Sequence, residues 1–229
     1  MRESAFERLY PKYWNRSYYL LKILSTSMQD IAKSIKLDPN KENVIADFGC
    51  GNSPYESLFK SQNAKYLKID LPENKNADIK INEQGKIEMP DQSVDVVIST
   101  QVLEHVHDPE LYLNEAFRIL KPGGHLIIST HGYWIFHPDP TDYWRWTSMG
   151  LRRIVEEAGF SIISFTGLLG RIAYGLQLFQ DGLYFKLPKF LKLALPVFTQ
   201  AFIILFDKIE SKENRDKDAC VYIIKAIKN

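Results

Sequence analysis

At positions 44–54 the chain reads Val44-Ile45-Ala46-Asp47-Phe48-Gly49-Cys50-Gly51-Asn52-Ser53-Pro54. The apolar run that opens this stretch is typical of a buried strand in a parallel sheet. Gly49 and Gly51 then permit a sharp turn and the close approach of a ligand, because neither carries a Cβ atom. We expect a helix to start near Ser53 and Pro54, since serine suits an N-cap and proline a first turn. The stretch therefore predicts a strand, a glycine turn and a helix, which is a unit of an α/β sheet.

A second predicted strand, at 65–70, also ends in an acid, Asp70. Asp70 lies nineteen residues beyond Gly51, about the spacing of a carboxylate that accepts hydrogen bonds from ribose hydroxyls. The third glycine of a dinucleotide-binding turn would fall on Pro54, which disfavours NAD and FAD. Asp47, directly ahead of the turn, would repel a pyrophosphate but suit a ligand with an ammonium and a sulfonium. S-adenosylmethionine carries both groups, so we expect it as the cofactor.

The chain resembles the class I S-adenosylmethionine-dependent methyltransferases in this stretch and in two further segments. These are Asp95-Val96-Val97-Ile98-Ser99-Thr100-Gln101-Val102-Leu103-Glu104-His105-Val106 and Arg118-Ile119-Leu120-Lys121-Pro122-Gly123-Gly124. The resemblance covers residues 40 to 165, and it implies methyl transfer as the activity. It also implies an α/β fold of the Rossmann-like methyltransferase type, with a doubly wound, mostly parallel seven-stranded sheet and an antiparallel last strand.

The resemblance further implies a set of cofactor-binding residues, namely Asp47, Gly49, Gly51, Asp70, Leu71, Asn82 and Gln101. The first three would cradle the methionine moiety. Asp70 would bind the ribose and Leu71 the adenine face, while Gln101 would reach the cofactor from the end of the fourth strand. The partner of the adenine amino group is ambiguous in segment 78–82, where Asn82 is the candidate.

Composition limits the class of protein. The 229 residues are 45% hydrophobic and 25% charged, as expected for one large globular domain with an appended segment. A formal net charge of +1 gives no basic footprint for nucleic acid, so we expect no such partner. Cys50 and Cys220 form neither a disulfide framework nor a metal pattern, and residues 1–15 do not read as a signal peptide. These features favour a cytoplasmic protein in which Cys50 is a small buried residue.

Periodicity and capping signals divide the chain. We expect an N-terminal helical cap (1–40), a cofactor-binding core (41–165), a helical apolar appendage (166–209), and a linker with the closing strand (210–229). Apolar residues at helical spacing predict one amphipathic helix from Leu20 to Ile35. Further helices are predicted from Asp108-Pro109-Glu110 and over 148–158, and further strands over 95–100, 125–130, 161–165 and 219–227.

The segment 131–147 is the predicted substrate loop. All five histidines lie between positions 105 and 137, and three of the four tryptophans lie between 134 and 146. The segment directly follows a predicted strand, and ligands of open α/β sheets bind outside the carboxyl ends of the strands. The alternative for its aromatic residues is a hydrophobic lid packed on the sheet edge.

Methyl transfer to a hydroxyl benefits from a general base, and His131 or His137 titrates in the right range. Asp139 or Asp142 could orient the imidazole, and we take His131, His137 and Asp142 as the catalytic candidates. His105 is expected to pack or hydrogen-bond beside the cofactor. A metal site of His131, His137 and Asp139 is weighed but not predicted, because a proline-containing loop does not preset ligand geometry.

The appendage leaves two interpretations open. Residues 193–206 carry no charge, but this run is too short to span a bilayer and Pro196 interrupts it. Lysines at 186, 189 and 192 flank apolar faces, a composition typical of a helix at a lipid interface, which predicts peripheral membrane contact through 186–206. The other interpretation is a helix pair that covers the substrate pocket or forms a homodimer contact.

Three functions follow from these patterns. The first is a methyltransferase for a hydroxyl of a small molecule or glycan, suggested by the aromatic and acidic loop. The second is a methyltransferase for a lipid-like acceptor, such as a quinone precursor, at the membrane surface. The third is a non-catalytic S-adenosylmethionine-binding module, since fold and cofactor pocket do not prove turnover.

Overall fold

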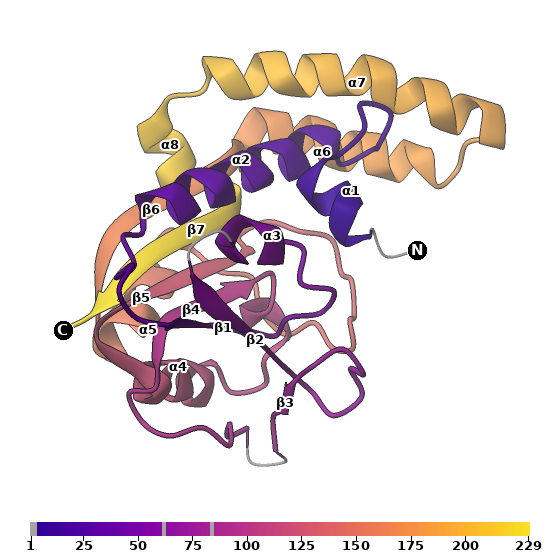
Figure 1. The fold of residues 1–229 in the computed structure, drawn as a ribbon. Coiled ribbons are helices and arrows are strands. Elements are labelled where there is room, and N and C mark those ends of the chain that lie inside the picture. Colours follow the sequence, from indigo (N-terminus) through magenta and orange to yellow (C-terminus); the bar gives the residue numbers. More distant parts are fainter. Residues whose placement is uncertain (1–3, 61–62, 83–84) are drawn as a thin grey trace.

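The computed structural model describes residues 4–60, 63–82 and 85–229. Its framework is a seven-stranded sheet with the order β3-β2-β1-β4-β5-β7-β6 (Figure 1). β7 runs antiparallel to both of its neighbours, and the other paired strands are parallel. The predicted fold class is therefore confirmed. The strands are β1 (Asn43–Phe48), β2 (Ala64–Asp70), β3 (Ile79–Lys80), β4 (Val94–Thr100), β5 (Leu120–His131), β6 (Phe160–Gly170) and β7 (Ala219–Lys228).

The apolar run near position 45 forms β1, which pairs with β2 on one side and β4 on the other. Its side chains alternate between the two faces of the sheet: Ala46 and Phe48 belong to one core and Ile45 to the other. Because both faces are buried, residues 44–46 read as a continuous apolar run instead of an alternating pattern.

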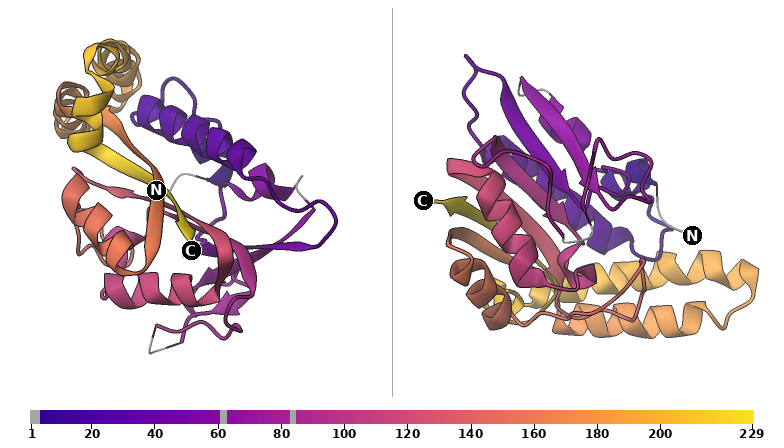
Figure 2. Two further views of the ribbon diagram at one scale, coloured as in Figure 1. Left: turned by 90° about the vertical axis from the view of Figure 1, so that its left-hand side faces the viewer. Right: turned by 90° about the horizontal axis from the view of Figure 1, so that it is seen from below.

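Helices cover both faces of the sheet (Figures 1 and 2). One core contains side chains of α4 (Pro109–Ile119) and α5 (Ser148–Glu157). The other contains side chains of α2 (Tyr18–Ser34), α3 (Glu56–Phe59) and the start of α6 (Arg171–Tyr184). The predicted amphipathic helix corresponds to α2, and a short helix, α1 (Ala5–Leu9), precedes it.

Capping chemistry sets several helix ends as predicted. The Asp108 side chain accepts a hydrogen bond from the Leu111 N–H at the start of α4, where Pro109 is the first residue. α5 ends just before Gly159, whose φ of +96° is in the left-handed region that glycine adopts without a steric penalty.

The predicted helix start near Ser53 and Pro54 is wrong. Ser53 has a φ of 47°, and its N–H donates to the Cys50 carbonyl, so the turn continues through it. α3 begins only at Glu56, with Tyr55 as the N-cap. The left-handed backbone at Ser53 is incompatible with an N-cap, which normally has extended backbone angles.

The C-terminal part holds a helical pair between the last two strands. β6 runs to Gly170, five residues beyond the predicted strand end at 165, and leads directly into α6. α6 and α7 (Lys189–Ile209) lie side by side and project beyond the sheet (Figures 1 and 2). A short helix, α8 (Lys212–Lys217), lies in the expected charged connector. Within the described residues, no helix combines the length and apolar character needed to cross a bilayer.

Candidate functional site

The glycine turn that follows β1 has the backbone that its residues predict. Gly49 has a φ of +79° and Gly51 a φ of +52°. A Cβ atom on Gly49 would lie 2.6 Å from both methyl carbons of Val102, whereas one on Gly51 would meet nothing within 4 Å. Gly49 is therefore required by packing, and Gly51 leaves open space where a ligand can approach the backbone.

Asp70, at the end of β2, is hydrogen-bonded to this turn. Its Oδ2 accepts from the Gly51 N–H at 2.8 Å and from the Asn74 amide at 2.6 Å, and its Oδ1 accepts from the Leu71 N–H at 2.8 Å. Leu71 is 41% exposed, so an apolar surface lies next to the carboxylate. The structure thus brings the second strand-end acid to the glycine turn, as the spacing predicts.

Asp47 is buried at the end of β1, and the Tyr66 hydroxyl donates to its Oδ2 at 2.8 Å. Burial raises the pKa of this carboxyl to about 7, against the opposing effect of hydrogen bonds from Tyr66 and Ser53. A cationic ligand nearby would favour the ionised form. Burial also raises the pKa of the Cys50 thiol to about 12, in keeping with a packing role for Cys50.

The other two predicted cofactor residues lie at neighbouring strand ends. Gln101 follows β4 with a φ of 56°, and its amide donates to Ser129 Oγ on β5 at 3.2 Å. Asn82 follows β3, which pairs with the end of β2. The side-chain oxygen of Asn82 accepts from the Lys86 N–H at 2.9 Å.

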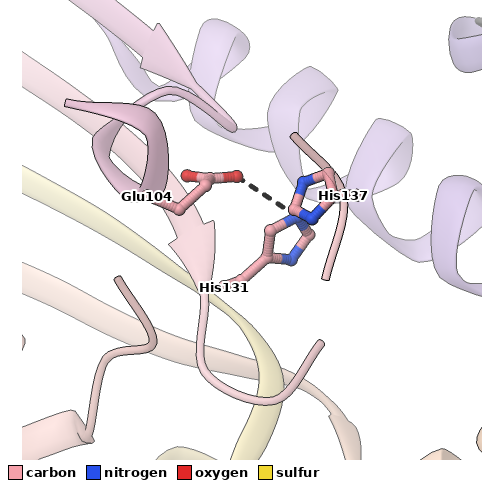
Figure 3. A group of neighbouring side chains, drawn as sticks. All are labelled: Glu104, His131 and His137. Carbon is pink, nitrogen blue, oxygen red and sulfur yellow. Dashed lines mark ion pairs between the residues drawn. The ribbon is translucent and has the colours of Figure 1, made fainter. Parts of the chain in front are cut away.

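A second group of polar side chains gathers at the carboxyl ends of β4 and β5 (Figure 3). His131 ends β5, Glu104 lies in the short 3-10 helix η2 (Leu103–His105) after β4, and His137 lies in the loop after β5. The Glu104 Oε1 atom is 3.2 Å from His131 Nε2. One donor atom from each of the three side chains lies within 4.8 Å of the other two.

Burial controls the protonation of this group. Glu104 is completely buried, which raises its pKa to about 7, and Thr130 Oγ1 donates to its Oε2 at 2.8 Å. Burial lowers the pKa of His131 well below its ordinary value and also lowers the pKa of His137. Both imidazoles are therefore uncharged at neutral pH and have a free lone pair for a proton or a metal ion.

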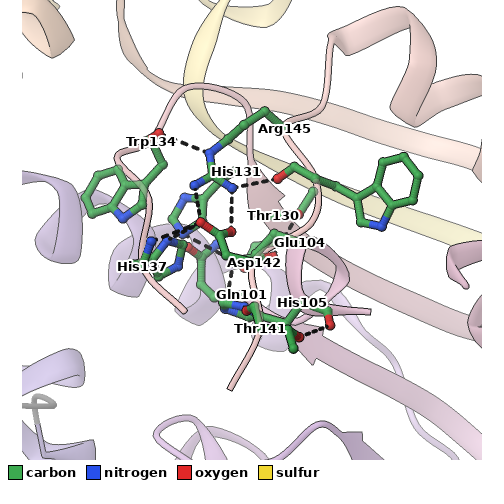
Figure 4. Close-up of polar contacts among 12 residues, drawn as sticks. Gln101, Glu104, His105, Thr130, His131, Trp134, His137, Thr141, Asp142 and Arg145 are labelled. Carbon is green, nitrogen blue, oxygen red and sulfur yellow. Dashed lines mark hydrogen bonds and ion pairs between the residues drawn. The ribbon is translucent and has the colours of Figure 1, made fainter. Parts of the chain in front are cut away.

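Arg145 organises the predicted substrate loop around Asp142 (Figure 4). The guanidinium donates to both carboxylate oxygens of Asp142 at 2.6 Å and to the carbonyls of Trp134 and Ile135 at 3.0 and 2.9 Å. Asp142 in turn accepts a hydrogen bond from the backbone N–H of His137 at 2.9 Å, and Arg145 holds the pKa of Asp142 well below its usual range. This arrangement fixes His137 beside a permanent carboxylate.

The same loop folds back over the segment after β4. The N–H groups of Tyr143 and Trp144 both donate to the Glu104 carbonyl, at 2.9 and 3.1 Å. The Trp134 ring stacks on His131 with a centroid distance of 4.8 Å and an interplanar angle of 8°. Aromatic rings thus line the surroundings of the histidines.

The predicted catalytic residues His131, His137 and Asp142 therefore lie together. Sequence reasoning did not select Glu104 or Arg145, which complete the group. The sequence offered two signals for them: Glu104 is an acid directly before His105, and Arg145 lies between two tryptophans. The His105 ring packs edge-on against His137, with centroids 4.9 Å apart, and its Nδ1 contacts the Thr141 carbonyl.

Comparisons with known proteins match this chain to methyltransferases. The profile of a family described as "Methyltransferase domain" matches residues 20–165. A probable S-adenosylmethionine-dependent methyltransferase of Mycolicibacterium smegmatis is 29% identical over 133 residues, 52% of each chain. A ubiquinone biosynthesis O-methyltransferase of Pseudomonas fluorescens is 29% identical over 145 residues, 56% of this chain and 61% of the relative. The matched part of this chain spans about half the length of the first of these curated relatives.

Solved structures share the fold at low sequence identity. The cyclase SpnF superposes with a TM-score of 0.56 and 17% identity, covering 91% of this chain and 82% of SpnF. A phosphoethanolamine N-methyltransferase of Haemonchus contortus in complex with S-adenosylmethionine gives a TM-score of 0.56 and 15% identity, covering 98% of this chain and 56% of that one. Proteins with different reactions thus share this architecture, so the acceptor has to be argued from the site.

Proposed function

This chain belongs to the class I S-adenosylmethionine-dependent methyltransferases, and on that premise we propose that it transfers a methyl group from S-adenosylmethionine to a hydroxyl of a small molecule or glycan. The observation that carries the choice of a hydroxyl is the pairing of an uncharged imidazole, His137, with a fixed carboxylate, Asp142. A hydroxyl must lose its proton during methylation, and such a pair can accept one.

The residues around the glycine turn fit the cofactor. Asp70 is held so that its carboxylate faces the turn, where it can accept hydrogen bonds from ribose hydroxyls, and Leu71 offers an exposed apolar surface for a base. The open space at Gly51 admits the methionine moiety, and Asp47 supplies a negative charge nearby when it is ionised. The cofactor, when bound, supplies an electrophilic methyl group on a sulfonium.

The chain's own residues would then prepare the acceptor. The aromatic side chains of the substrate loop exclude water and stack against a ring, and loop carboxylates can bind hydroxyls. His137 is the accessible histidine of the group, with a side chain that is 30% exposed, whereas the His131 side chain is 6% exposed. His137 therefore accepts the acceptor's proton, and Asp142 stabilises the resulting imidazolium.

Radiolabelled methyl transfer tests this proposal. Purified protein is incubated with labelled S-adenosylmethionine and fractions of soluble glycans and small metabolites, and His137→Ala is compared with His107→Ala, a histidine outside the group. We expect His137→Ala to lower the rate by roughly 10²–10⁴-fold with unchanged cofactor affinity, and His107→Ala to leave the rate unchanged. Equal rates in the wild type, His137→Ala and His131→Ala would eliminate the proposed base.

A lipid-like acceptor is the second candidate, because α6 and α7 expose many large apolar side chains. Phe198 is 69% exposed, and the others include Ile172, Leu178, Phe179, Leu191, Phe202, Leu205 and Ile209. Such a surface suits contact with a membrane that holds the acceptor. Co-sedimentation with anionic vesicles that disappears when lysines 186, 189 and 192 are replaced by glutamine would favour this candidate. Absence of co-sedimentation in the wild type would favour a soluble acceptor.

A further inference from the structure

Glu104 and His131 carry buried polar atoms that the fold leaves unsatisfied. Among the described residues, neither Glu104 Oε1 nor His131 Nδ1 has a hydrogen-bond partner, although Oε1 approaches His131 Nε2 to 3.2 Å. Native proteins rarely leave buried carboxylate oxygens in this condition. An ion that accepts electron pairs from Glu104 Oε1 and His131 Nε2 would satisfy the carboxyl oxygen, although not His131 Nδ1.

One pair of these donor atoms has the separation that a small metal ion requires. Two ligands of a tetrahedral ion with bonds of about 2.0–2.1 Å lie about 3.3 Å apart, and Glu104 Oε1 and His131 Nε2 are 3.2 Å apart. His137 lies in the loop that follows His131, and one donor atom of its imidazole is within 4.8 Å of the other two (Figure 3). A small movement of the His137 side chain would bring all three donor atoms to ligand distances from one ion.

The surroundings also hold these side chains as metal ligands are usually held. Thr130 donates to the second oxygen of Glu104 at 2.8 Å, and Trp134 stacks on His131. His137 Nδ1 lies 3.1 Å from the Ile135 carbonyl and 3.5 Å from Asp142 Oδ2. Outer contacts of this kind orient ligating histidines and carboxylates.

The local charge is compatible with a cation. Two guanidinium groups, those of Arg8 and Arg145, act on Glu104 and His131, and the positive charge of Arg145 is offset by the Asp142 carboxylate to which it donates two hydrogen bonds. His105 and Asp142 form a second donor group with His137, so further acceptor atoms lie just outside the first three. The site therefore offers one buried carboxyl group and two imidazoles to an incoming ion.

We infer that Glu104, His131 and His137 bind a divalent transition-metal ion of the zinc type. Two imidazole nitrogens and one carboxylate favour such an ion over magnesium or calcium, which prefer oxygen ligands. Three protein ligands leave one position open, as in catalytic rather than structural sites. The role in catalysis rests on the proposed methyl transfer: the ion would lower the pKa of an acceptor hydroxyl in the open position, which would then lose its proton to solvent. The assignment of His137 as the base applies to the metal-free protein, and with the ion bound His137 would be a ligand.

Metal titration of the full chain tests the inference without any turnover. Protein freed of metal with a chelator and dialysed is titrated with Co²⁺, whose tetrahedral complexes absorb visible light, and with Zn²⁺ in a calorimeter. We expect one equivalent to bind. Glu104→Gln and His137→Gln should each weaken binding by at least ~10-fold, the lower end of the loss caused by changing even an outer-shell partner.

His107→Gln is the matched control, because His107 is exposed and packs against Tyr143 outside the group. It should bind Co²⁺ as the wild type does, and unchanged affinity for S-adenosylmethionine would show that each variant is folded. No binding to the wild type, or equal binding to all variants, overturns the inference. If the protein binds no Co²⁺ and still transfers methyl groups in chelator, the metal site is wrong and the proposed function stands. If it binds the ion but transfers no methyl group to any fraction, the metal site stands and the proposed function is wrong.

Discussion

The carboxyl group of Asp47 is balanced between its two protonation states near neutral pH. Burial opposes its charge, and hydrogen bonds from Tyr66 and Ser53 favour it, with a resulting pKa of about 7. The folded protein therefore holds this proton over a pH range in which the unfolded chain, with an ordinary carboxyl pKa, has released it. It follows that the contribution of Asp47 to the free energy of unfolding decreases as pH rises from about 4 to about 7.

Cofactor binding should release a proton from this group. A sulfonium or ammonium near Asp47 stabilises the carboxylate and lowers its pKa, so affinity for S-adenosylmethionine should rise between about pH 6 and pH 7. Calorimetry at one pH in buffers of different ionisation enthalpy measures the proton count. Asp47→Asn should abolish the release and weaken binding, and a wild type that releases no proton would contradict the assignment of Asp47 to the cofactor site.

The two glycines of the turn should respond differently to alanine. Both have positive φ, which costs a residue with a Cβ atom about 1–2 kcal/mol, but only Gly49 would place that atom against Val102. Gly49→Ala should therefore lower the free energy of unfolding by more than Gly51→Ala, which should mainly reduce cofactor affinity. Urea denaturation and calorimetry of both variants check this, and the reverse order of stabilities would be inconsistent with the turn described here.

At the level of elements, prediction succeeded where the signal is local. The apolar run of β1, the Asp108 cap of α4 and the spacing of Asp70 each depend on residues that are near in sequence or on the regular geometry of a parallel sheet. The end of β6 was missed, because its last five residues include Gly167 and Gly170 and read as a break. Both glycines are needed by long-range packing: a Cβ on Gly167 would overlap the Arg215 carbonyl, and one on Gly170 would overlap Glu210.

The polar group around Glu104 was only partly predictable, because some of its members come together through contacts between segments that are distant in sequence. His131, His137 and Asp142 come from one aromatic loop, so composition alone drew attention to them. Glu104 joins them through the register of β4 with β5, in which Thr100 pairs with Ser129, and through the return of the loop over the Glu104 carbonyl. Neither contact has a local sequence signal.

Arg145 should be essential for the order of the substrate loop. Lysine cannot reproduce two hydrogen bonds to Asp142 together with those to two carbonyls, because it lacks the planar guanidinium fork. Arg145→Lys should therefore make residues 132–147 exchange amide hydrogens faster and lower the methyl-transfer rate, with cofactor affinity retained. Arg153→Lys, at an exposed pair with Glu157, is the control and should change neither property. Unchanged exchange in Arg145→Lys would argue against a clamp.

Across the whole molecule, buried polar contacts join segments that are far apart in the chain. The Arg16 carbonyl accepts amide hydrogen bonds from Gln177, Gln180 and Gln200, and so ties the segment before α2 to both α6 and α7. Asp207 accepts from the Gly170 N–H at 2.9 Å and from the Tyr19 hydroxyl at 2.8 Å, and Arg215 approaches it at 3.5 Å. The helical pair is thus attached to the N-terminal cap, the sheet and α8.

Removal of the Asp207 carboxylate should weaken the assembly as a unit. Asp207→Ala leaves the Tyr19 hydroxyl and the buried Gly170 N–H without their acceptor, and Arg215 keeps only its hydrogen bond to the Asp207 backbone carbonyl. The loss of an acceptor typically costs about 1–3 kcal/mol for each buried donor left unsatisfied. Urea denaturation should show this loss in a single transition, because the contact joins three regions. Glu213→Ala, at an exposed pair with Lys217, should leave the urea midpoint unchanged. A second, early transition confined to Asp207→Ala would instead indicate that the helical pair unfolds by itself.

The strand order has a consequence for biosynthesis. β6 has β7 as its neighbour in the sheet, yet α6, α7 and α8 are translated between the two. While the ribosome makes those helices, the nascent β6 therefore has no hydrogen-bonding partner strand, and its edge is open to association with other newly made chains. The half-sheet of β1 to β5 can form early, but this edge closes only after residues 219–228 have left the exit tunnel. Chaperone protection during that interval should therefore raise the yield of this protein.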